Sequence, residues 1–363
     1  MNLPTFKIGN KEVLIPIIQG GMGVGVSLGR LAAAVANEGG IGVISGSQIG
    51  FREIDFKTNN DNANIKGLIS EIRLAKKLSP NGIIGVNFLV AVNNYKEMVL
   101  AAVKEKVDVI IAGAGLPKTL PELVKGSHTK IIPIVSSGKA ASLISKVWDR
   151  RYNYIPDAII VEGPLAGGHL GFSLEQLKFN NMPKLLDIVK DVIESTKTFV
   201  EKYRREIPVI AAGGIYDGKD IAKYINAGAN GVQIGTRFVA TNECEAHDNF
   251  KQAYINAKES DIKIISSPVG MPGRAIRNEF VKRIEKSKLK INKCYKCLKG
   301  CNPNMAPYCI TDALVASVKG DVNNGLIFVG SNASKIKRIV SVKELMNELI
   351  GEAEKFIKKR RTN

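Results

Sequence analysis

One histidine of this chain lies in a turn that also holds a carboxylate and four glycines. This turn spans residues 162–171, from Glu162 to Gly171, and directly follows the apolar run Ala158–Val161. Glycines allow a backbone to approach a flat or phosphorylated ligand closely. An imidazole exchanges protons near neutral pH. The pattern therefore predicts a catalytic His169, with an ordinary glycine-rich loop as the alternative.

Two later glycine-containing turns are of the kind that binds phosphate. Gly213-Gly214 and Gly235-Thr236 each follow an apolar run. Backbone N–H groups at such turns can cradle a phosphate, and the threonine hydroxyl adds a hydrogen bond. We predict a phosphate site at these four residues. The alternative is a pair of tight strand–helix turns without a ligand.

Four of the five cysteines are clustered near the C-terminus. Cys294, Cys297, Cys301 and Cys309 have the spacing C-x2-C-x3-C-x7-C, whereas Cys244 is alone. Four thiolates can bind a structural zinc or an iron–sulfur cluster. In a chain that we expect to be cytoplasmic, such a cluster indicates a metal site rather than disulfides. Zinc, iron–sulfur and four reduced structural cysteines all stay open at this point.

Eight apolar runs bounded by glycine or proline must position these residues. They are rich in Val, Ile and Ala, as expected of strands that are buried on both faces of a parallel sheet. Helical patterns separate most of them, so we predict an α/β fold, a TIM (β/α)8 barrel. A doubly wound sheet is the alternative. The runs are Ile15–Met22, Gly40–Gly46, Gly82–Leu89, Val107–Gly115, Lys130–Ser137, Asp157–Gly163, Pro208–Gly214 and Gly231–Phe238.

Nearly every run ends in small or polar residues, and in a barrel these ends share one rim, where active sites lie. The His169 turn follows the sixth run. The chain after residue 238 has no comparable strand series. We therefore predict a barrel over 1–238, a mostly helical cap with the cysteines over 239–341, and a C-terminal helix over 342–363 that returns to the barrel.

The chain is strongly basic, with 52 Lys and Arg against 34 Asp and Glu, a formal net charge of +18 over 363 residues. No nucleic-acid-binding motif accompanies this charge. No apolar run is long enough to span a membrane, and the N-terminus has no signal-peptide pattern. We expect a cytoplasmic protein with a small-molecule substrate and neither nucleic acid nor membrane as a partner. An acidic carrier protein and a homodimer remain open.

The chain resembles the family of FMN-dependent nitronate monooxygenases (2-nitropropane dioxygenases) and enoyl-acyl-carrier-protein reductases II. The resemblance covers most of residues 12–280. It is carried, in order, by Ile15–Met22, Gly85–Asn87, Ala112–Gly115, Glu162–Gly171, Ala211–Ile215 and Gln233–Arg237.

This resemblance implies an FMN across the barrel mouth. Its phosphate would lie on the predicted glycine pairs, and the other flavin contacts would come from Gly21, Met22, Asn87, Glu162, Gly167, Gly168, Gln233 and Ile234. His169 would be the catalytic histidine. Of the other histidines, we expect His128 in a solvent-facing loop and His247 in a capping or packing role.

Three functions are compatible with the sequence. The first, which we predict, is the oxidation of alkyl nitronates with oxygen. The second is an enoyl-acyl-carrier-protein reductase that uses NADH or NADPH, favoured by the cap segment 320–330, and the third is a non-catalytic flavin- or phosphate-binding protein. Arg274 or Arg277 could bind a substrate anion, with a surface salt bridge as the alternative.

Overall fold

Eight parallel strands close into a barrel in the computed structural model, which describes residues 3–357. The predicted TIM barrel is confirmed, and each predicted run contains one barrel strand. Around the barrel the order is β10-β11-β3-β4-β5-β6-β7-β8. The strands are β3 (Ile17–Gln19), β4 (Ile41–Ser45), β5 (Ile83–Leu89), β6 (Val109–Gly113), β7 (Lys130–Val135), β8 (Ile159–Glu162), β10 (Val209–Ala212) and β11 (Gly231–Ile234).

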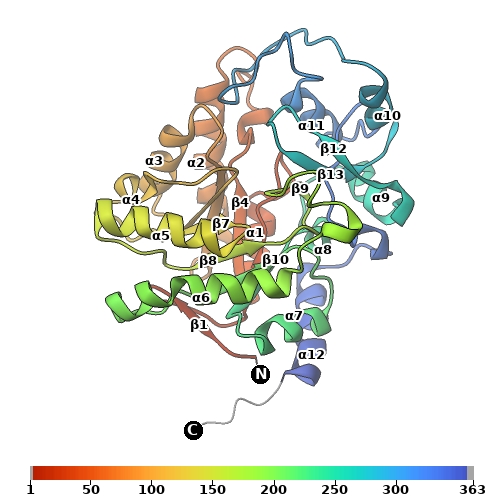
Figure 1. The fold of residues 1–363 in the computed structure, drawn as a ribbon. Helices are drawn as coiled ribbons and strands as arrows, with labels where there is room; N and C mark the ends of the chain where they lie inside the picture. Colours follow the sequence, from red (N-terminus) through yellow and green to blue (C-terminus); the bar gives the residue numbers. More distant parts are fainter. Residues whose placement is uncertain (1–2, 358–363) are drawn as a thin grey trace.

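Helices cover the outside of the barrel (Figure 1). Their apolar faces pack on strands that are themselves buried on both sides, which explains why the strands read as continuous apolar runs. The helices are α1 (Gly29–Asn37), α2 (Asn60–Leu78), α3 (Tyr95–Lys104), α4 (Leu120–Leu123), α5 (Gly138–Tyr152), α6 (Leu185–Tyr203), α7 (Gly218–Asn226) and the short α8 (Thr236–Val239).

An N-terminal hairpin covers the amino-terminal end of the barrel (Figure 1). Its strands are β1 (Phe6–Ile8) and β2 (Lys11–Val13). Ile8 and Val13 are fully buried and belong to the same apolar cluster as the inward-facing strand residues. Water is thereby excluded from this end, so only the opposite end of the barrel is available to a ligand.

The C-terminal part forms a cap above the carboxyl ends of the strands (Figure 1). It contains α9 (Asp248–Asn256), α10 (Glu279–Lys286) and α11 (Ile310–Val318). It also contains an antiparallel pair, β12 (Ile262–Ser266) and β13 (Pro272–Ile276), that the sequence analysis did not predict. A third strand of this sheet, β9 (Gly168–His169), comes from the histidine turn of the barrel.

The last helix, α12 (Val342–Phe356), lies beside α7 on the barrel (Figure 1). The Gly218 backbone N–H donates to the Glu352 carboxylate at 2.8 Å. Residues 358–363 of the predicted C-terminal segment lie outside the described residues. Among residues 3–357, none of the helices combines the length and the apolar character that crossing a membrane requires.

Close packing of α1 on β4 depends on Gly42. A methyl group there would lie 1.7 Å from the Ala32 carbonyl oxygen. Gly42→Ala should therefore lower the free energy of unfolding by about 3 kcal/mol, measured by denaturant titration. Gly351→Ala on α12 is the matched control, because nothing lies within 4 Å of the added methyl. We expect that variant to gain about 0.5–1 kcal/mol. Equal effects at both positions would contradict this packing.

Candidate active site

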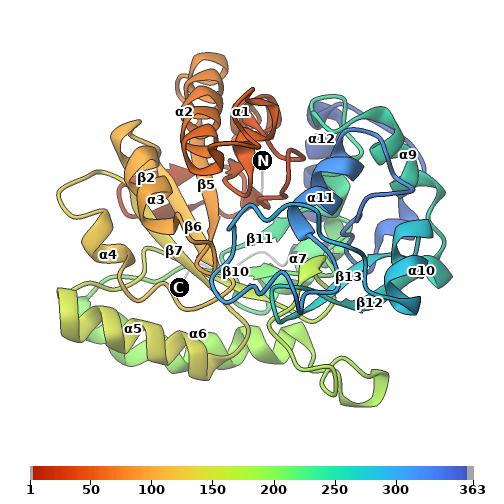
Figure 2. The same cartoon turned by 90° about the horizontal axis from the view of Figure 1, so that it is seen from above.

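A pocket with a volume of about 410 Å³ lies at the carboxyl ends of the barrel strands. This volume is in the range of small-molecule binding sites. Barrel residues such as Ser45, Asn87 and Glu162 form its floor, and residues of α9 and α11 contribute its roof. Seen from above, the cap elements α11, β12 and β13 lie on one side of the barrel (Figure 2).

The structure brings the predicted site residues together. His169 and all the residues predicted to contact a flavin line this one pocket, although they come from five separate segments of the chain. They are Gly21, Met22, Asn87, Glu162, Gly167, Gly168, Gly213, Gly214, Gln233, Ile234, Gly235 and Thr236. Their roles toward a cofactor stay predictions.

The cap sheet positions His169. In the antiparallel register His169 is opposite Gly273, and the Leu170 N–H donates to the Pro272 carbonyl at 2.8 Å. The histidine therefore follows a barrel strand in sequence but is held by hydrogen bonds to the cap. Gly168 has a φ of 73°, a left-handed conformation that favours glycine at this bend.

The His169 imidazole is partly buried and has two close neighbours. Its Nε2 lies 2.7 Å from the Ser267 hydroxyl oxygen, and the Phe328 ring packs edge-on at a centroid distance of 4.9 Å. Burial lowers the pKa of His169 to about 4. The imidazole is therefore neutral at pH 7. Sequence reasoning missed Ser267, since 98 residues separate it from His169.

The Glu162 carboxyl is also uncharged over much of the neutral range. It ends β8 and faces the pocket. Removal from water raises its pKa to about 7. The pocket thus places an imidazole that favours its neutral form close in sequence to a carboxyl that favours its protonated form.

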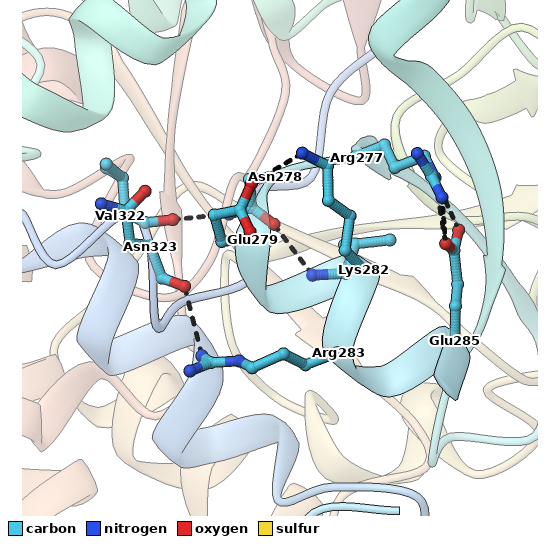
Figure 3. A network of polar contacts seen from close by, with 9 residues as sticks. Arg277, Asn278, Glu279, Lys282, Arg283, Glu285, Val322 and Asn323 are labelled. Atoms are coloured by element: carbon cyan, nitrogen blue, oxygen red, sulfur yellow. Dashed lines mark hydrogen bonds and ion pairs between the residues drawn. The ribbon is translucent and has the colours of Figure 1, made fainter. Parts of the chain in front are cut away.

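Neither candidate arginine lines the pocket. Arg277 pairs with Glu285 at 2.7 Å on the outer face of the cap (Figure 3), so the salt-bridge alternative is correct for this residue. Arg274 is buried, and its guanidinium donates to the Ala166 carbonyl within the histidine turn. Burial lowers the Arg274 pKa to about 10. The residues that line the pocket include no lysine or arginine.

A cap segment closes over the predicted phosphate site. The Thr236 hydroxyl accepts a hydrogen bond from the Gly330 N–H at 3.1 Å, and the Asn332 amide donates to the Gly214 carbonyl at 2.7 Å. Gly213 and Gly214 both have positive φ, and a methyl on Gly214 would lie 2.8 Å from Leu165 Cβ. Only glycine fits these turns.

The other two histidines lie outside the pocket. His128 is exposed, as predicted. The Nδ1 of His247 accepts a hydrogen bond from the Asn249 N–H at 3.1 Å and caps α9, which confirms the predicted capping role.

The cysteine cluster is not confirmed as a metal site. Cys297 lines the pocket, whereas the other three clustered cysteines do not. Within residues 3–357, no group of three or more His, Cys, Asp or Glu side chains is arranged to hold a metal ion. Zinc or iron–sulfur binding by these thiols stays a prediction.

Comparison with known proteins adds three findings. The family model for nitronate monooxygenase matches residues 5–352. A probable nitronate monooxygenase from Staphylococcus aureus is 28% identical over 294 residues, which cover 74% of this chain and 77% of that protein. The solved structure of FabK from Thermotoga maritima is 28% identical, with a TM-score of 0.72 and coverage of 94% of each chain.

A further relative comes from Rhodococcus jostii. It is the (3aS,4S,5R,7aS)-5-hydroxy-7a-methyl-1-oxo-octahydro-1H-indene-4-carboxyl-CoA dehydrogenase, 29% identical over 272 residues. The match covers 75% of this chain and 65% of that relative, so the chain spans less than two thirds of its length.

The raised Glu162 pKa predicts a pH-dependent stability difference. In the folded protein the carboxyl keeps its proton up to a pKa of about 7, whereas in the unfolded chain it loses the proton near its ordinary pKa of 4.5. The stabilisation is therefore present below pH 4.5 and lost as the pH rises through 7. Flavin-free Glu162→Gln should gain stability over the wild type across this window, by up to about 3 kcal/mol.

Thermal unfolding of both proteins between pH 5 and 8 measures this difference. His169 has the opposite dependence, because its lowered pKa costs stability as the pH falls. The wild-type curve is therefore compared with the variant, which retains His169. A difference between the two proteins that does not change with pH would contradict the assignment.

Proposed function

Because the chain belongs to the nitronate monooxygenase family, we propose that it is an FMN-dependent oxidoreductase that oxidises alkyl nitronates with oxygen. The observation that carries this proposal is the neutral, partly buried His169 in a pocket lined by all the residues that resemble a flavin site. The products would be a carbonyl compound and nitrite.

The residues of the pocket fit a bound FMN. A methyl on Gly21 would lie 2.4 Å from Asn87 Cβ, so only glycine leaves the barrel mouth open at that point. The Ser45 hydroxyl, buried at the end of β4, has no hydrogen-bond partner among the described residues. A buried polar atom of this kind calls for a ligand. Gly213, Gly214, Gly235 and Thr236 would hold the phosphate.

When bound, FMN supplies the electron-accepting chemistry. The residues of the chain would handle the proton and exclude water. As a neutral imidazole, His169 has one protonated and one bare ring nitrogen, so it can accept the α-carbon proton of a neutral nitroalkane, which gives the nitronate, or orient a nitronate that is already deprotonated. The Ser267 hydroxyl fixes the ring through Nε2. The apolar cap side chains Phe328 and Leu314 keep the site dry.

Replacement of His169 tests this role. His169→Gln should lower kcat/KM for oxygen uptake with a neutral nitroalkane by roughly 10²–10⁴-fold, since the group that accepts the α-carbon proton is lost. Oxygen uptake with a preformed nitronate, which has already lost that proton, should change much less. The FMN content should stay unchanged, because the flavin contacts lie elsewhere in the pocket. His128→Gln, on the exposed loop, is the matched control and should keep full activity. Absence of nitronate-dependent oxygen uptake by the FMN-loaded wild type would refute the proposed function.

One observation favours a second function, the reduction of an enoyl thioester by NADH or NADPH. The cap side of the pocket is apolar, and an anionic nitronate would find no lysine or arginine among the lining residues. A neutral acyl chain would find a suitable surface there. The apolar residues from the cap are Leu298, Ile310, Leu314, Leu326, Phe328 and Val329. A relative named for a carboxyl-CoA substrate supports the same class.

Leu314→Trp separates this function from the first. Under anaerobic conditions NADH or NADPH should bleach the flavin, and an enoyl thioester should restore its colour. The larger side chain should reduce the rate of reoxidation by a long-chain enoyl thioester about tenfold and leave the rate with a crotonyl thioester unchanged. Failure of both thioesters to reoxidise the wild-type flavin would exclude this second function.

A further inference from the structure

The cysteine segment between α10 and α11 is fixed against the barrel. The Asn93 N–H donates to the Cys297 carbonyl at 3.1 Å, and the Lys299 N–H donates to the Ala91 carbonyl at 2.8 Å. The Tyr295 ring stacks on Phe56 with a centroid distance of 5.3 Å. The segment is thus held in place as part of the pocket wall, although it contains no helix or strand.

Two of the sulfur atoms accept hydrogen bonds. The Lys296 N–H donates to Cys294 Sγ at 3.3 Å, and the Thr311 hydroxyl donates to Cys297 Sγ at 3.2 Å. Lys296 has a φ of 51°, a left-handed conformation that is uncommon for a residue with a side chain and that turns the backbone around the first sulfur. Hydrogen bonds to sulfur are a means by which proteins stabilise metal-bound thiolates.

The amino-terminal end of α11 brings two more features to the same place. Cys309 is the N-cap residue of this helix, and Thr311, which bonds Cys297, lies in its first turn. The Tyr295 hydroxyl donates to the Asp312 carboxylate of that turn at 2.7 Å. Cys297, through its hydrogen bond from Thr311, and the N-cap residue Cys309 therefore lie at the same helix end.

The remaining sulfur lies close by, and the surroundings are basic. Cys301 packs against the same apolar cluster as Cys297. Lys293, Lys296 and Lys299 are exposed along the segment. Their positive charges would offset the negative charge of four thiolates and the group they bind.

A single zinc ion needs all four sulfurs about 2.3 Å from one point. Within the described residues, no three His, Cys, Asp or Glu side chains are gathered around one point to hold a metal ion. An iron–sulfur cluster is larger than one ion and holds its four thiolates farther apart, so it does not require that arrangement.

We propose that Cys294, Cys297, Cys301 and Cys309 bind an iron–sulfur cluster in the wall of the active-site pocket. Because Cys297 also lines that pocket, the cluster would border the space assigned to the flavin. The binding of the cluster stands on the cysteine segment alone, and only its neighbour, the flavin, rests on the proposed function.

The test uses the full-length protein purified without oxygen and reconstituted with ferrous iron and sulfide. Wild-type protein should contain equal amounts of iron and acid-labile sulfide, about two to four of each per chain, with a broad visible absorbance that dithionite bleaches. Cys294→Ser and Cys301→Ser should each lose at least half of the iron. The matched control is Cys244→Ser, a buried cysteine outside the cluster, which should keep it.

Three results would overturn the proposal. They are zinc in place of iron without sulfide, no stoichiometric metal in the wild type, and iron that the cluster substitutions leave unchanged. The metal content of the wild type decides the question even where a variant does not fold. FMN is measured separately after extraction. A protein with the cluster and without FMN would contradict the proposed function but not this inference.

Discussion

The pairing of β9 with β13 is the interaction on which the site depends. Through this pairing, Gly168 and His169, which follow the barrel strand β8, form the third strand of the cap sheet. His169 is fixed by this pairing, and the same sheet continues into β12, next to Ser267. Arg274 reinforces it from β13 by its hydrogen bond to Ala166. Barrel and cap are thus parts of one site, because His169 belongs to both.

The molecule is strongly basic whereas its pocket is not, and this contrast is a second constraint, on what the pocket can bind. The chain has a formal net charge of +18, yet the pocket lining contains no lysine or arginine, and its only histidine and carboxylate favour their neutral forms. Desolvation explains both shifts, since burial disfavours the charged form of each group. Such a site suits proton handling and apolar substrates.

The sequence was sufficient for the barrel and for the residues around its mouth. Apolar runs such as those of β6 and β10 can be recognised from a few neighbouring residues. Their glycine-rich ends all lie on one rim of the barrel, because parallel strands point in the same direction. Ser267, the β12–β13 pair and the partner of Arg274 could not be found in this way. Ser267 and the partner of Arg274 depend on contacts between residues about a hundred positions apart, for which no local pattern exists. The β12–β13 pair is local in sequence, with Ser266 opposite Pro272, but its two short strands are interrupted by Pro268 and Gly270.

Residues 330–332 cross the predicted phosphate site and therefore affect how a ligand could reach it. Gly330 and Asn332 bond Thr236 and Gly214, and the backbone at residues 329–330 lies against Gly167 so closely that a methyl there would be 2.6 Å from Gly330 N. A group held on those glycines, as predicted, would be covered on the cap side by these contacts. Its exchange with the solution would require local opening of the cap, so the bound group would behave as a resident component that is acquired during folding rather than as a second substrate.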